Sequence, residues 1–363
     1  MKVIDLFAGC GGLSIGFMQN GATIKSALEY DSSIARTYKS NHPDVDVVVD
    51  DIKNVDQSNL YKKDDATVII GGPPCQGFSM AGARIRQGFI DDPRNYLFKH
   101  YFNIVKNVRP KAFLIENVKG LMTMQNGKVF KEILNIFSSH ELLAGEPYKV
   151  YYKLVNTVDF GIPQKRERVI IMGTLDQSVN FEEAWENTVI EIRNEHPNYF
   201  DKVTVRDAIE NLPVVTKDGI IQNPIPVTDY QKYVSSAKST ISNHSKTNHS
   251  LLAINRMKKV TGGENYKVLD EEIKSIHSGA YGRLEWDEPA PTITTRFDTP
   301  AGGRFIHPVY HRTLSPREAA RIQSFPDDFI FHGNKTSICK QIGNAVPPKL
   351  SYFLAHLIKK IIT

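Results

Sequence analysis

Residues 71–84 read GGPPCQGFSMAGAR and place Cys75, one of three cysteines in the chain, directly after two prolines. Proline fixes its own backbone angle, lacks an N–H donor and pushes the preceding residue towards extended geometry. The thiol of Cys75 is therefore carried on a stiff, non-helical support. Such a thiol can serve as a nucleophile, and the alternative is a tight turn in which Cys75 packs as a small apolar residue.

Further polar side chains follow or flank predicted strands. Glu116 lies in LIENVKG, and Gln164, Arg166 and Arg168 lie in IPQKRERVII. In a doubly wound sheet, sites assemble at the carboxyl edge of the strands. A thiol, a carboxyl group and two arginines along that edge suit attack on an electron-poor heteroaromatic ring. Taken singly, Glu116 could cap a loop and the arginines could form a solvated ion-pair face.

A glycine-rich turn, DLFAGCGG, follows the first predicted strand. Its glycines Gly9, Gly11 and Gly12 let the backbone turn tightly and approach a ligand at a helix N-terminus. Glu29 ends the next strand, where a carboxylate can hold ribose hydroxyls, and Asp51 follows VDVVV, where it could reach a purine. The pattern predicts a nucleoside cofactor, although its spacing differs from the G-x-G-x-x-G of dinucleotide enzymes.

Short β-branched runs alternate with helical patterns over the first part of the chain. The predicted strands are 2–7, 23–30, 66–72, 111–118 and 168–173, and the predicted helices are 11–21, 31–41, with Asp31 as N-cap, and 95–108. Strands that alternate with helices indicate βαβ units. We therefore expect an α/β fold with a doubly wound, mostly parallel sheet.

From about residue 175 to 310 the chain is rich in Asn, Ser, Thr, Pro and Gly, which predicts a smaller, loop-rich second domain. Order returns at 315–325, a helix capped by Ser315 with Pro316 at its first position. The amphipathic helix at 347–362 should pack on the first domain, because its apolar stripe must be buried. We expect one domain over 1–175 completed by 338–363, and the other over 176–337.

The composition is that of a globular protein, with 363 residues, 41% hydrophobic and 23% charged. A net charge of +5 permits a polyanionic partner without requiring one. The other two cysteines, Cys10 and Cys339, are too distant for a disulfide framework, which favours the cytoplasm. No stretch has the length of a signal peptide or membrane span. His244 and His249 lack partners at metal-ligand spacing, so we expect no metal.

Six segments carry a resemblance over nearly the whole chain, except about 175–285. They are DLFAGCGGLSIGF, GGPPCQGFS, ENVKGL, QKRERV, REAARIQSFP and GNAVPP. In this order they resemble the motif set of the cytosine-C5 DNA methyltransferases of restriction–modification type. The resemblance implies S-adenosylmethionine as cofactor, double-stranded DNA as substrate and a target base flipped out of the duplex.

The residue types suit this reaction. C5 of cytosine is a poor nucleophile, and addition of a thiolate to C6 leaves an enamine-like C5 that can attack a methyl group. A free thiol is mostly protonated at neutral pH, so Arg166, Arg168 and a helix N-terminus would raise the thiolate fraction of Cys75. By resemblance, Glu116 donates a proton or hydrogen bond at N3, and Arg168 contacts O2 and orients Glu116.

The resemblance also implies binding residues. The cofactor pocket would be formed by Phe7, Gly9, Gly11, Glu29, Tyr30, Asp51, Ile52, Pro73 and Leu97, and completed by Asn344 and Ala345. The residues expected to touch DNA are Gln76, Ser79, Arg84, Arg86, Gln164, Arg296 and Arg304. Residues 76–94 would close over the flipped base, and the second domain would recognise the target sequence.

Two alternatives stay open at this point. One is transfer-RNA cytosine methylation, and the other is a catalytically silent protein that binds a specific DNA sequence. QGFSMAGAR after the prolines is similar to the DNA enzymes, and a pure binder has no use for the thiol. We expect a monomer that acts in the cytoplasm on nucleoid DNA, with a cognate restriction endonuclease as a separate partner and no membrane.

Overall fold

The computed structural model describes residues 1–74, 96–271, 273, 275 and 277–363. These residues form two compact units. Unit 1 comprises Met1–Asn156, Glu167–His196 and Leu350–Thr363, and unit 2 comprises Thr157–Arg166 and Pro197–Lys349. The two functional domains expected from the sequence stay a prediction, and each unit is described by itself.

Unit 1 is built on a seven-stranded sheet with the order β3-β2-β1-β4-β5-β8-β6. Its strands are β1 (Lys2–Leu6), β2 (Thr23–Glu29), β3 (Asp46–Val49), β4 (Val68–Gly71), β5 (Ala112–Val118), β6 (Lys149–Asn156) and β8 (Glu167–Thr174). The first five run parallel, and β8 is antiparallel to both β5 and β6. The predicted α/β fold with a mostly parallel sheet is confirmed.

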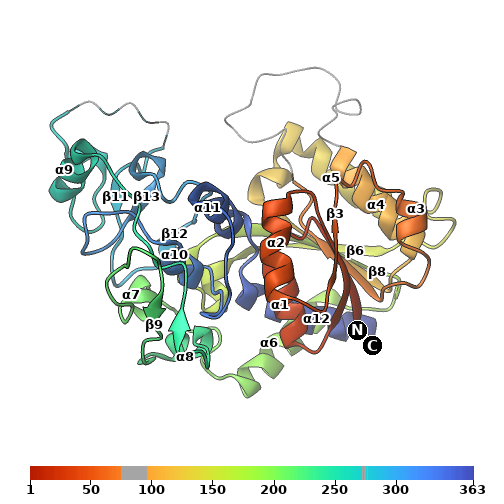
Figure 1. Ribbon diagram of the computed structural model, residues 1–363. Coiled ribbons are helices and arrows are strands. Elements are labelled where there is room, and N and C mark those ends of the chain that lie inside the picture. The colour runs from red at the N-terminus through yellow and green to blue at the C-terminus, as the bar shows by residue number, and fades with distance from the viewer. Residues whose placement is uncertain (75–95, 272, 274, 276) are drawn as a thin grey trace. The chain divides into compact units, whose positions relative to one another are not determined.

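The helices of this unit cover both faces of the sheet (Figure 1). They are α1 (Gly12–Gln19), α2 (Ser32–Asn41), α3 (Gln57–Leu60), α4 (Tyr96–Val108), α5 (Lys128–Phe137), α6 (Phe181–Glu195) and α12 (Pro348–Ile362), the last belonging to unit 1 from Leu350 onward. Helices α4 and α5 lie on one face, and α1 and α2 lie on the other.

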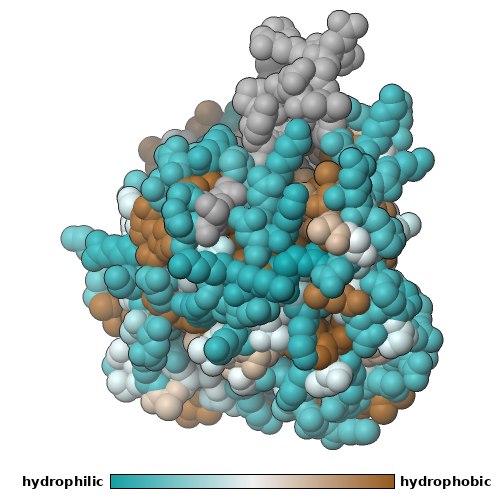
Figure 2. Space-filling view, turned by 90° about the vertical axis from the view of Figure 1, so that its right-hand side faces the viewer, coloured by the Kyte–Doolittle hydropathy of each residue, from teal (hydrophilic) through white to brown (hydrophobic). Residues whose placement is uncertain are grey.

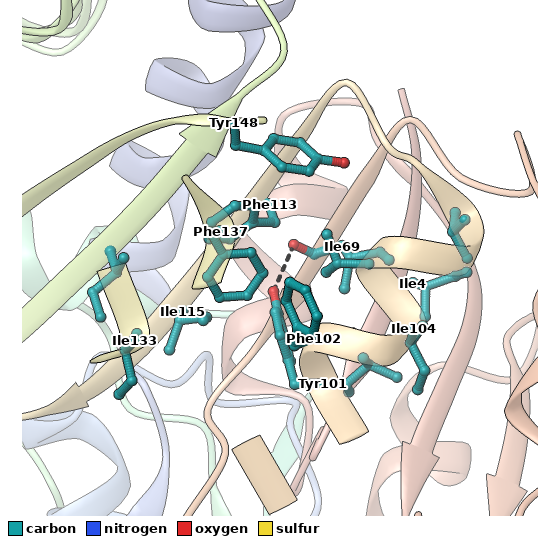
Figure 3. Close-up of a cluster of buried hydrophobic side chains, with 14 of the residues drawn as sticks. Ile4, Ile69, Tyr101, Phe102, Ile104, Phe113, Ile115, Ile133, Phe137 and Tyr148 are labelled. Carbon is teal, nitrogen blue, oxygen red and sulfur yellow. Dashed lines mark hydrogen bonds between the residues drawn. The ribbon is translucent and has the colours of Figure 1, made fainter. Parts of the chain in front are cut away.

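The main apolar core lies between the sheet and helices α4 and α5 (Figure 3). Alternate strand residues such as Ile4, Ile69 and Phe113 point into it, as the two-residue period of a strand requires. The ring of Phe137 stacks on Phe113 at 4.1 Å. The buried hydroxyl of Tyr101 donates to the carbonyl of Ile69 at 3.1 Å, so this polar group is satisfied inside the core.

The opposite face packs on α1 and the C-terminal helix. A Cβ atom on Gly16 would lie 2.1 Å from the backbone nitrogen of Tyr352, so α1 and α12 touch backbone to backbone. The hydroxyl of Ser351 also donates to the carbonyl of Leu13. The prediction that the last helix packs on the first domain is confirmed, as is the N-cap Asp31, whose side chain accepts from Ser33 N at 3.0 Å.

One sequence expectation was wrong. The stretch after residue 175 was expected to be loop-rich. Its residues Phe181–Glu195 instead form the 15-residue helix α6, which belongs to unit 1. Its N-cap Asn180 accepts from Glu183 N at 3.4 Å. Few apolar positions are needed because only one side of α6 is buried, through Phe181, Thr188 and Ile192. These buried positions are too few to predict a helix from the sequence.

Unit 2 is rich in loops. It contains α7 (Val205–Ile209), α8 (Asp229–Val234), α9 (Leu251–Lys259), α10 (Pro316–Ile322), α11 (Lys335–Asn344) and the short strands β7 (Gln164–Lys165), β9 (Ile221–Gln222), β10 (Thr240–Ile241), β11 (Gly282–Arg283), β12 (Ala290–Pro291) and β13 (Arg304–Ile306). The strands pair as β9 with β10, β11 with β13 and β7 with β12. The helices and strands of unit 2 are therefore short, and no long apolar helix or strand among them forms its framework.

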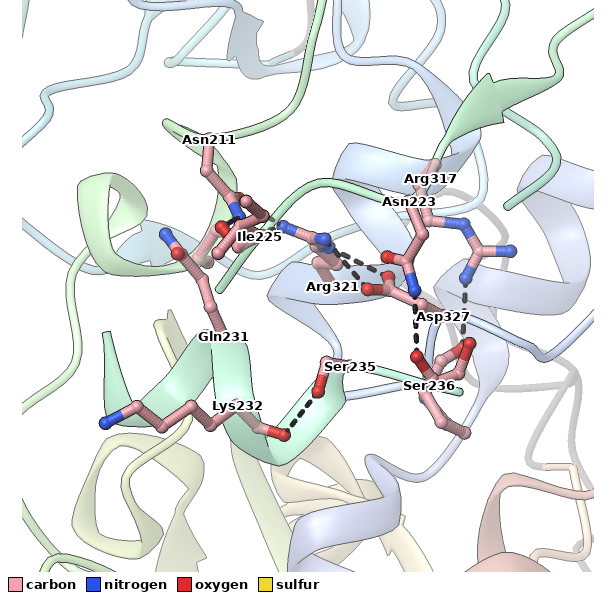
Figure 4. Close-up of polar contacts among 12 residues, drawn as sticks. Asn211, Asn223, Ile225, Gln231, Lys232, Ser235, Ser236, Arg317, Arg321 and Asp327 are labelled. Carbon is pink, nitrogen blue, oxygen red and sulfur yellow. Dashed lines mark hydrogen bonds and ion pairs between the residues drawn. The ribbon is translucent and has the colours of Figure 1, made fainter. Parts of the chain in front are cut away.

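Buried arginines on α10 tie the loops of unit 2 together. Arg321 forms two bonds of 2.8 Å to Asp327 (Figure 4). Arg317 donates to the backbone carbonyls of Ser242, Pro326 and Phe329. The helix begins as predicted, with Pro316 at its first position and a capping box between Ser315 and Glu318. These bonds add to the apolar contacts of unit 2, such as the ring contacts among Phe325, Phe329 and Phe331.

The surface drawn in Figure 2 is mostly hydrophilic, with small hydrophobic areas between the polar side chains. Among the described residues, no helix is long and apolar enough to span a bilayer. In the same part of the chain, no group of three or more His, Cys, Asp or Glu side chains is placed to hold a metal ion. His244 is buried and bonded to Ser315 Oγ at 2.9 Å and to the carbonyl of Pro213 at 2.7 Å.

Candidate active site

The candidate site lies at the carboxyl edge of the sheet in unit 1. Strands β1 to β5 run parallel, so the segments that follow them meet at this edge. Strand β8 runs the opposite way, and its first residues therefore lie at the same edge. Arg168 on β8 pairs with Val118 on β5 in the ladder, two residues beyond Glu116.

Glu116 and Arg168 form a buried ion pair at this edge. Arg168 Nε lies 2.8 Å from Glu116 Oε1, and the two side chains are 11% and 9% exposed. A second nitrogen of the guanidinium, Nη1, donates to the carbonyl of Glu167 at 2.7 Å. The expected orientation of the Glu116 carboxyl by Arg168 stays a prediction, and this ion pair is the contact on which it rests.

The start of the proline segment lies against the same carboxyl group. A Cβ atom on Gly72 would lie 3.6 Å from Glu116 Oε2, and Asn117 Nδ2 donates to the carbonyl of Pro73 at 2.9 Å. Asn117 thus fixes the chain two residues before Cys75. The predicted residues Cys75, Gln76, Ser79, Arg84 and Arg86 lie outside the described residues.

The other two cysteines are buried thiols. Burial raises the pKa of Cys10 to about 12, and burial likewise raises the pKa of Cys339 to about 12. Neither group forms a thiolate near neutral pH, so neither is suited to nucleophilic attack.

The glycine-rich turn after β1 forms a cradle at the N-terminus of α1. Gly9 and Gly11 have φ angles of 57° and 95°, and Phe7 also adopts a positive φ of 58°, which is strained for a bulky residue. A Cβ atom on Gly9 would meet open space, whereas one on Gly11 would lie 2.7 Å from His42 Nε2. The turn therefore leaves room for a ligand at Gly9.

Glu29, at the end of β2, closes one side of this cradle. Its Oε2 accepts from the backbone N–H of Gly9 at 2.9 Å, and its Oε1 accepts from Asp31 N at 2.9 Å. A carboxylate held by two backbone donors next to an open glycine turn fits the ribose of a nucleoside cofactor. The two features fit the predicted nucleoside cofactor, and S-adenosylmethionine at this site stays a prediction.

Other predicted cofactor residues lie beside or near the edge. Ile52 is buried, and Asp51 follows β3 and accepts from Lys53 N at 3.0 Å. Tyr30 is 58% exposed, directly after Glu29. Leu97, on α4, packs against the core.

Sequence reasoning missed a buried polar chain beneath the turn. Tyr38 and Ser14 are joined by a hydrogen bond of 2.7 Å, and Ser14 Oγ donates to Asp5 Oδ2 at 2.6 Å. Burial raises the pKa of Asp5 to about 7, the bond from Ser14 lowers it, and the nearby charge of Glu29 raises it further. The signal in the sequence was Asp5 itself, an acidic residue within the apolar run KVIDLF that was predicted to be a buried strand.

The remaining predicted residues lie in unit 2. Gln164 and Arg166 are fully buried there and bond to other residues of that unit. Arg166 donates to the carbonyls of Gly343 at 3.0 Å and Ala345 at 3.2 Å, next to Asn344. In this structure Arg166 supports the segment that contains Asn344 and Ala345.

The two arginines expected to read DNA differ in exposure. Arg296 is exposed, and its guanidinium lies 3.4 Å from Thr299 Oγ1. Arg304 is half-buried and donates to the carbonyl of Gly263. Arg296 is thus the better placed of the two to meet a ligand.

Comparisons with known proteins agree with this fold. The family model of the C-5 cytosine-specific DNA methylases matches residues 1–360. The Type II methyltransferase M1.HphI of Haemophilus parahaemolyticus is 35% identical over all of this chain and 88% of that protein. M.NgoPII of Neisseria gonorrhoeae is 34% identical over 99% of this chain and 96% of its own length.

Solved structures give the same result. A putative DNA modification methyltransferase encoded within an Escherichia coli prophage matches with a TM-score of 0.75 and 28% identity, over 99% of both chains. The Schizosaccharomyces pombe Dnmt2 methyltransferase shares the fold, with a TM-score of 0.63 and 15% identity over 99% of this chain and 98% of its own. The chain belongs to the C-5 cytosine-specific DNA methylase family and is a DNA cytosine-5-methyltransferase of restriction–modification type.

Proposed function

We propose that this chain methylates C5 of a flipped-out cytosine in a specific duplex sequence, through a covalent bond between Cys75 and C6. The observation that carries the proposal is the convergence at one sheet edge of Glu116, Arg168 and the backbone leading to Cys75. The buried, protonated states of Cys10 and Cys339 also support Cys75 as the nucleophile.

Cys75, Glu116 and Arg168 have different roles in the reaction. The thiolate of Cys75 forms a bond to C6, and Glu116, which has taken up a proton from solvent, gives that proton to N3, so that charge does not build up on the ring. Arg168 holds Glu116 and contacts O2. When C5 has been methylated, a base takes the C5 proton, the S–C6 bond breaks, and the proton on N3 returns to Glu116.

The glycine-rich cradle would bind the second substrate, S-adenosylmethionine. S-adenosylmethionine, when bound, supplies the methyl group that C5 accepts. Glu29 would bind the ribose hydroxyls, Phe7, Gly9 and Gly11 would line the pocket, and Asp51 and Ile52 would meet the adenine. Tyr30, Pro73 and Leu97 would complete this pocket in unit 1, and Asn344 and Ala345 of unit 2 would also bind the cofactor.

Unit 2 would recognise the target sequence. Arg296 would read a base edge, with guanine the preferred partner of arginine, and Arg304 would support the same surface. Gln76, Ser79, Arg84 and Arg86 would contact the DNA around the flipped base. Because Gln164 is fully buried, its part in DNA binding would be to support the backbone. We further propose a monomer that acts on cytoplasmic DNA, with any cognate endonuclease acting separately.

The test measures transfer of a radioactive methyl group from S-adenosylmethionine to duplex DNA and to transfer RNA. We expect incorporation into the duplex, abolished by Cys75→Ala and retained by the matched control Cys339→Ala. Incorporation into transfer RNA alone would assign the chain to RNA. Activity of Cys75→Ala at the wild-type level would exclude the covalent route.

A further inference from the structure

Two buried glutamines of unit 2 form a continuous line of side-chain amides. The backbone N–H of Ile293 donates to Gln164 Oε1 at 2.8 Å, and Gln164 Nε2 donates to Gln323 Oε1 at 2.7 Å. Gln323 Nε2 in turn donates to the carbonyl of Ile342 at 2.7 Å. Both side chains are completely buried. We call this line, formed by Gln164 and Gln323, the amide relay.

The relay has a fixed direction. Each amide accepts at its oxygen and donates at its nitrogen, so the orientation of one amide sets that of the next. If either amide were turned over, like groups would face each other without solvent, and a buried polar group left unpaired costs about 1–3 kcal/mol. The two glutamines therefore hold each other in one orientation.

The relay ends on a backbone carbonyl of α11. Ile342 lies in the last turn of this helix, and its carbonyl accepts from Ala345 N at 3.4 Å as well as from Gln323 Nε2. Arg166 takes the neighbouring carbonyls of Gly343 and Ala345, and it also bonds to the carbonyl of Ile293 at 3.1 Å. One end of the relay thus lies on Ile293, whose carbonyl Arg166 binds, and the other lies on Ile342, next to the carbonyls of Gly343 and Ala345 that Arg166 also binds. Together these bonds hold the segment 342–345.

Close packing also restricts the segment 342–345. A Cβ atom on Gly343 would lie 2.4 Å from the carbonyl carbon of Thr294. Thr294 and Ile293 follow the strand β12, which pairs with β7 through Ala290 and Gln164. Backbone contact on one side and the relay on the other determine where Asn344 and Ala345 lie within unit 2.

We propose that Gln323, acting through the relay, is a positioning residue that places Asn344 and Ala345 for S-adenosylmethionine. The inference rests on the proposed function, in which these two residues bind the cofactor. It adds a residue that touches neither cofactor nor DNA but sets the affinity for the cofactor.

The test measures cofactor dissociation constants by calorimetry for the wild type, Gln323→Leu, Asn344→Ala and the control Gln231→Leu. Gln231 is an equally buried glutamine of unit 2 whose Oε1 accepts from Val227 N in a capping box remote in sequence from 342–345. We expect Gln323→Leu to weaken binding about tenfold, equivalent to about one lost hydrogen bond. Gln231→Leu should lower the melting temperature and leave the dissociation constant unchanged.

A second variant separates positioning from a loss of folding. Gln323→Glu keeps the shape but, when ionised, cannot donate to the carbonyl of Ile342. Its cofactor affinity relative to the wild type should recover as the pH falls, since a protonated carboxyl group again offers one donor and one acceptor. A merely structural role would give no such recovery in affinity.

The outcomes are distinguishable. If Asn344→Ala weakens binding while Gln323→Leu does not, or if Gln231→Leu weakens it equally, the relay proposal is overturned and the pocket assignment stands. If Asn344→Ala has no effect, the part of Asn344 in the pocket fails, and the inference fails with it. A wild-type protein that does not bind S-adenosylmethionine overturns both proposals.

Discussion

At the scale of single residues, the chemistry depends on how Glu116 is held. Its carboxyl group has Arg168 on one side and the backbone of Gly72 on another, so it has little freedom to move. A general acid must lie within hydrogen-bond reach of its target in one orientation, and this packing provides it. Neighbours that hold the carboxyl group thus matter as much as the group itself.

The first prediction concerns Glu116→Gln. Glutamine keeps the shape and can still donate a hydrogen bond, but it cannot give a proton to N3. We expect kcat to fall about 10²- to 10³-fold, within the range for loss of a general acid, while the dissociation constant of the cofactor stays unchanged. Single-turnover methylation measures this, with the exposed Glu141→Gln as control. A wild-type rate for Glu116→Gln would remove Glu116 from the reaction.

The second prediction concerns Asp5→Asn and pH. Burial raises the pKa of Asp5 to about 7, above the value of 3.8 for an exposed Asp, so the folded state binds more protons than the unfolded state between these values. The contribution of Asp5 to the free energy of unfolding therefore falls as the pH rises from about 4 to 7, and above 7 its full cost is present.

Asparagine keeps the acceptor for Ser14 and carries no charge. We expect Asp5→Asn to be more stable than the wild type at pH 8, by up to about 4 kcal/mol, and equally stable near pH 4. Urea unfolding at both pH values measures the difference. A gap between the two proteins that does not change with pH would contradict a buried, titrating Asp5.

At the scale of elements, the sequence predicted those whose pattern is local. The runs KVIDLF and ATVIIGG formed β1 and β4, and the cap at Asp31 and the box at Ser315 began helices as expected. Strand β6 was not predicted, because at the edge of the sheet most of its residues are only partly buried and its apolar run is weak. Local pattern thus identified most buried strands, and it missed both the half-exposed β6 and the helix α5, which packs in the core.

The third prediction concerns the packing of α1 on α12. Gly16→Ala would place a methyl group 2.1 Å from the backbone nitrogen of Tyr352, where no side chain can move aside. Overpacking of this kind costs about 1–3 kcal/mol, and backbone contact puts the cost at the upper end. Urea unfolding should show this loss for Gly16→Ala. Gly120→Ala, where a Cβ meets nothing within 4 Å, should be neutral.

At the scale of the whole molecule, the sequence offered candidate site residues more readily than it offered their arrangement. Glu116 and Arg168 were expected together and lie 2.8 Å apart. Gln164 and Arg166 were expected at a ligand, yet their bonds go to segments more than 120 residues further along the chain. No local pattern reports such pairings, so the partners of a buried polar residue had to come from the structure.

The fourth prediction concerns DNA recognition by unit 2. We expect Arg296→Ala to weaken binding of the target duplex by about 1–3 kcal/mol and to relax its preference at one base pair. Gel-shift titrations against duplexes changed at single positions measure this. A uniform loss across all duplexes, with a smaller dependence on salt, would instead place Arg296 on a phosphate.

The control for this experiment is Arg193→Ala. Arg193 is exposed on α6, a helix with five glutamates that repel phosphate groups. Its loss should leave both the affinity for DNA and the sequence preference unchanged. Equal weakening by both variants would show that Arg296 acts only through net charge.

The central claim is a covalent bond between Cys75 and C6 of the target cytosine. The most direct measurement incubates the protein and S-adenosylmethionine with duplexes that contain 5-fluorocytosine, because fluorine at C5 cannot leave as a proton does. We predict an adduct that survives denaturation and maps to Cys75 by peptide mass spectrometry. A protein that binds the cofactor and methylates ordinary duplexes, yet forms no adduct on the fluorinated target, would contradict the account.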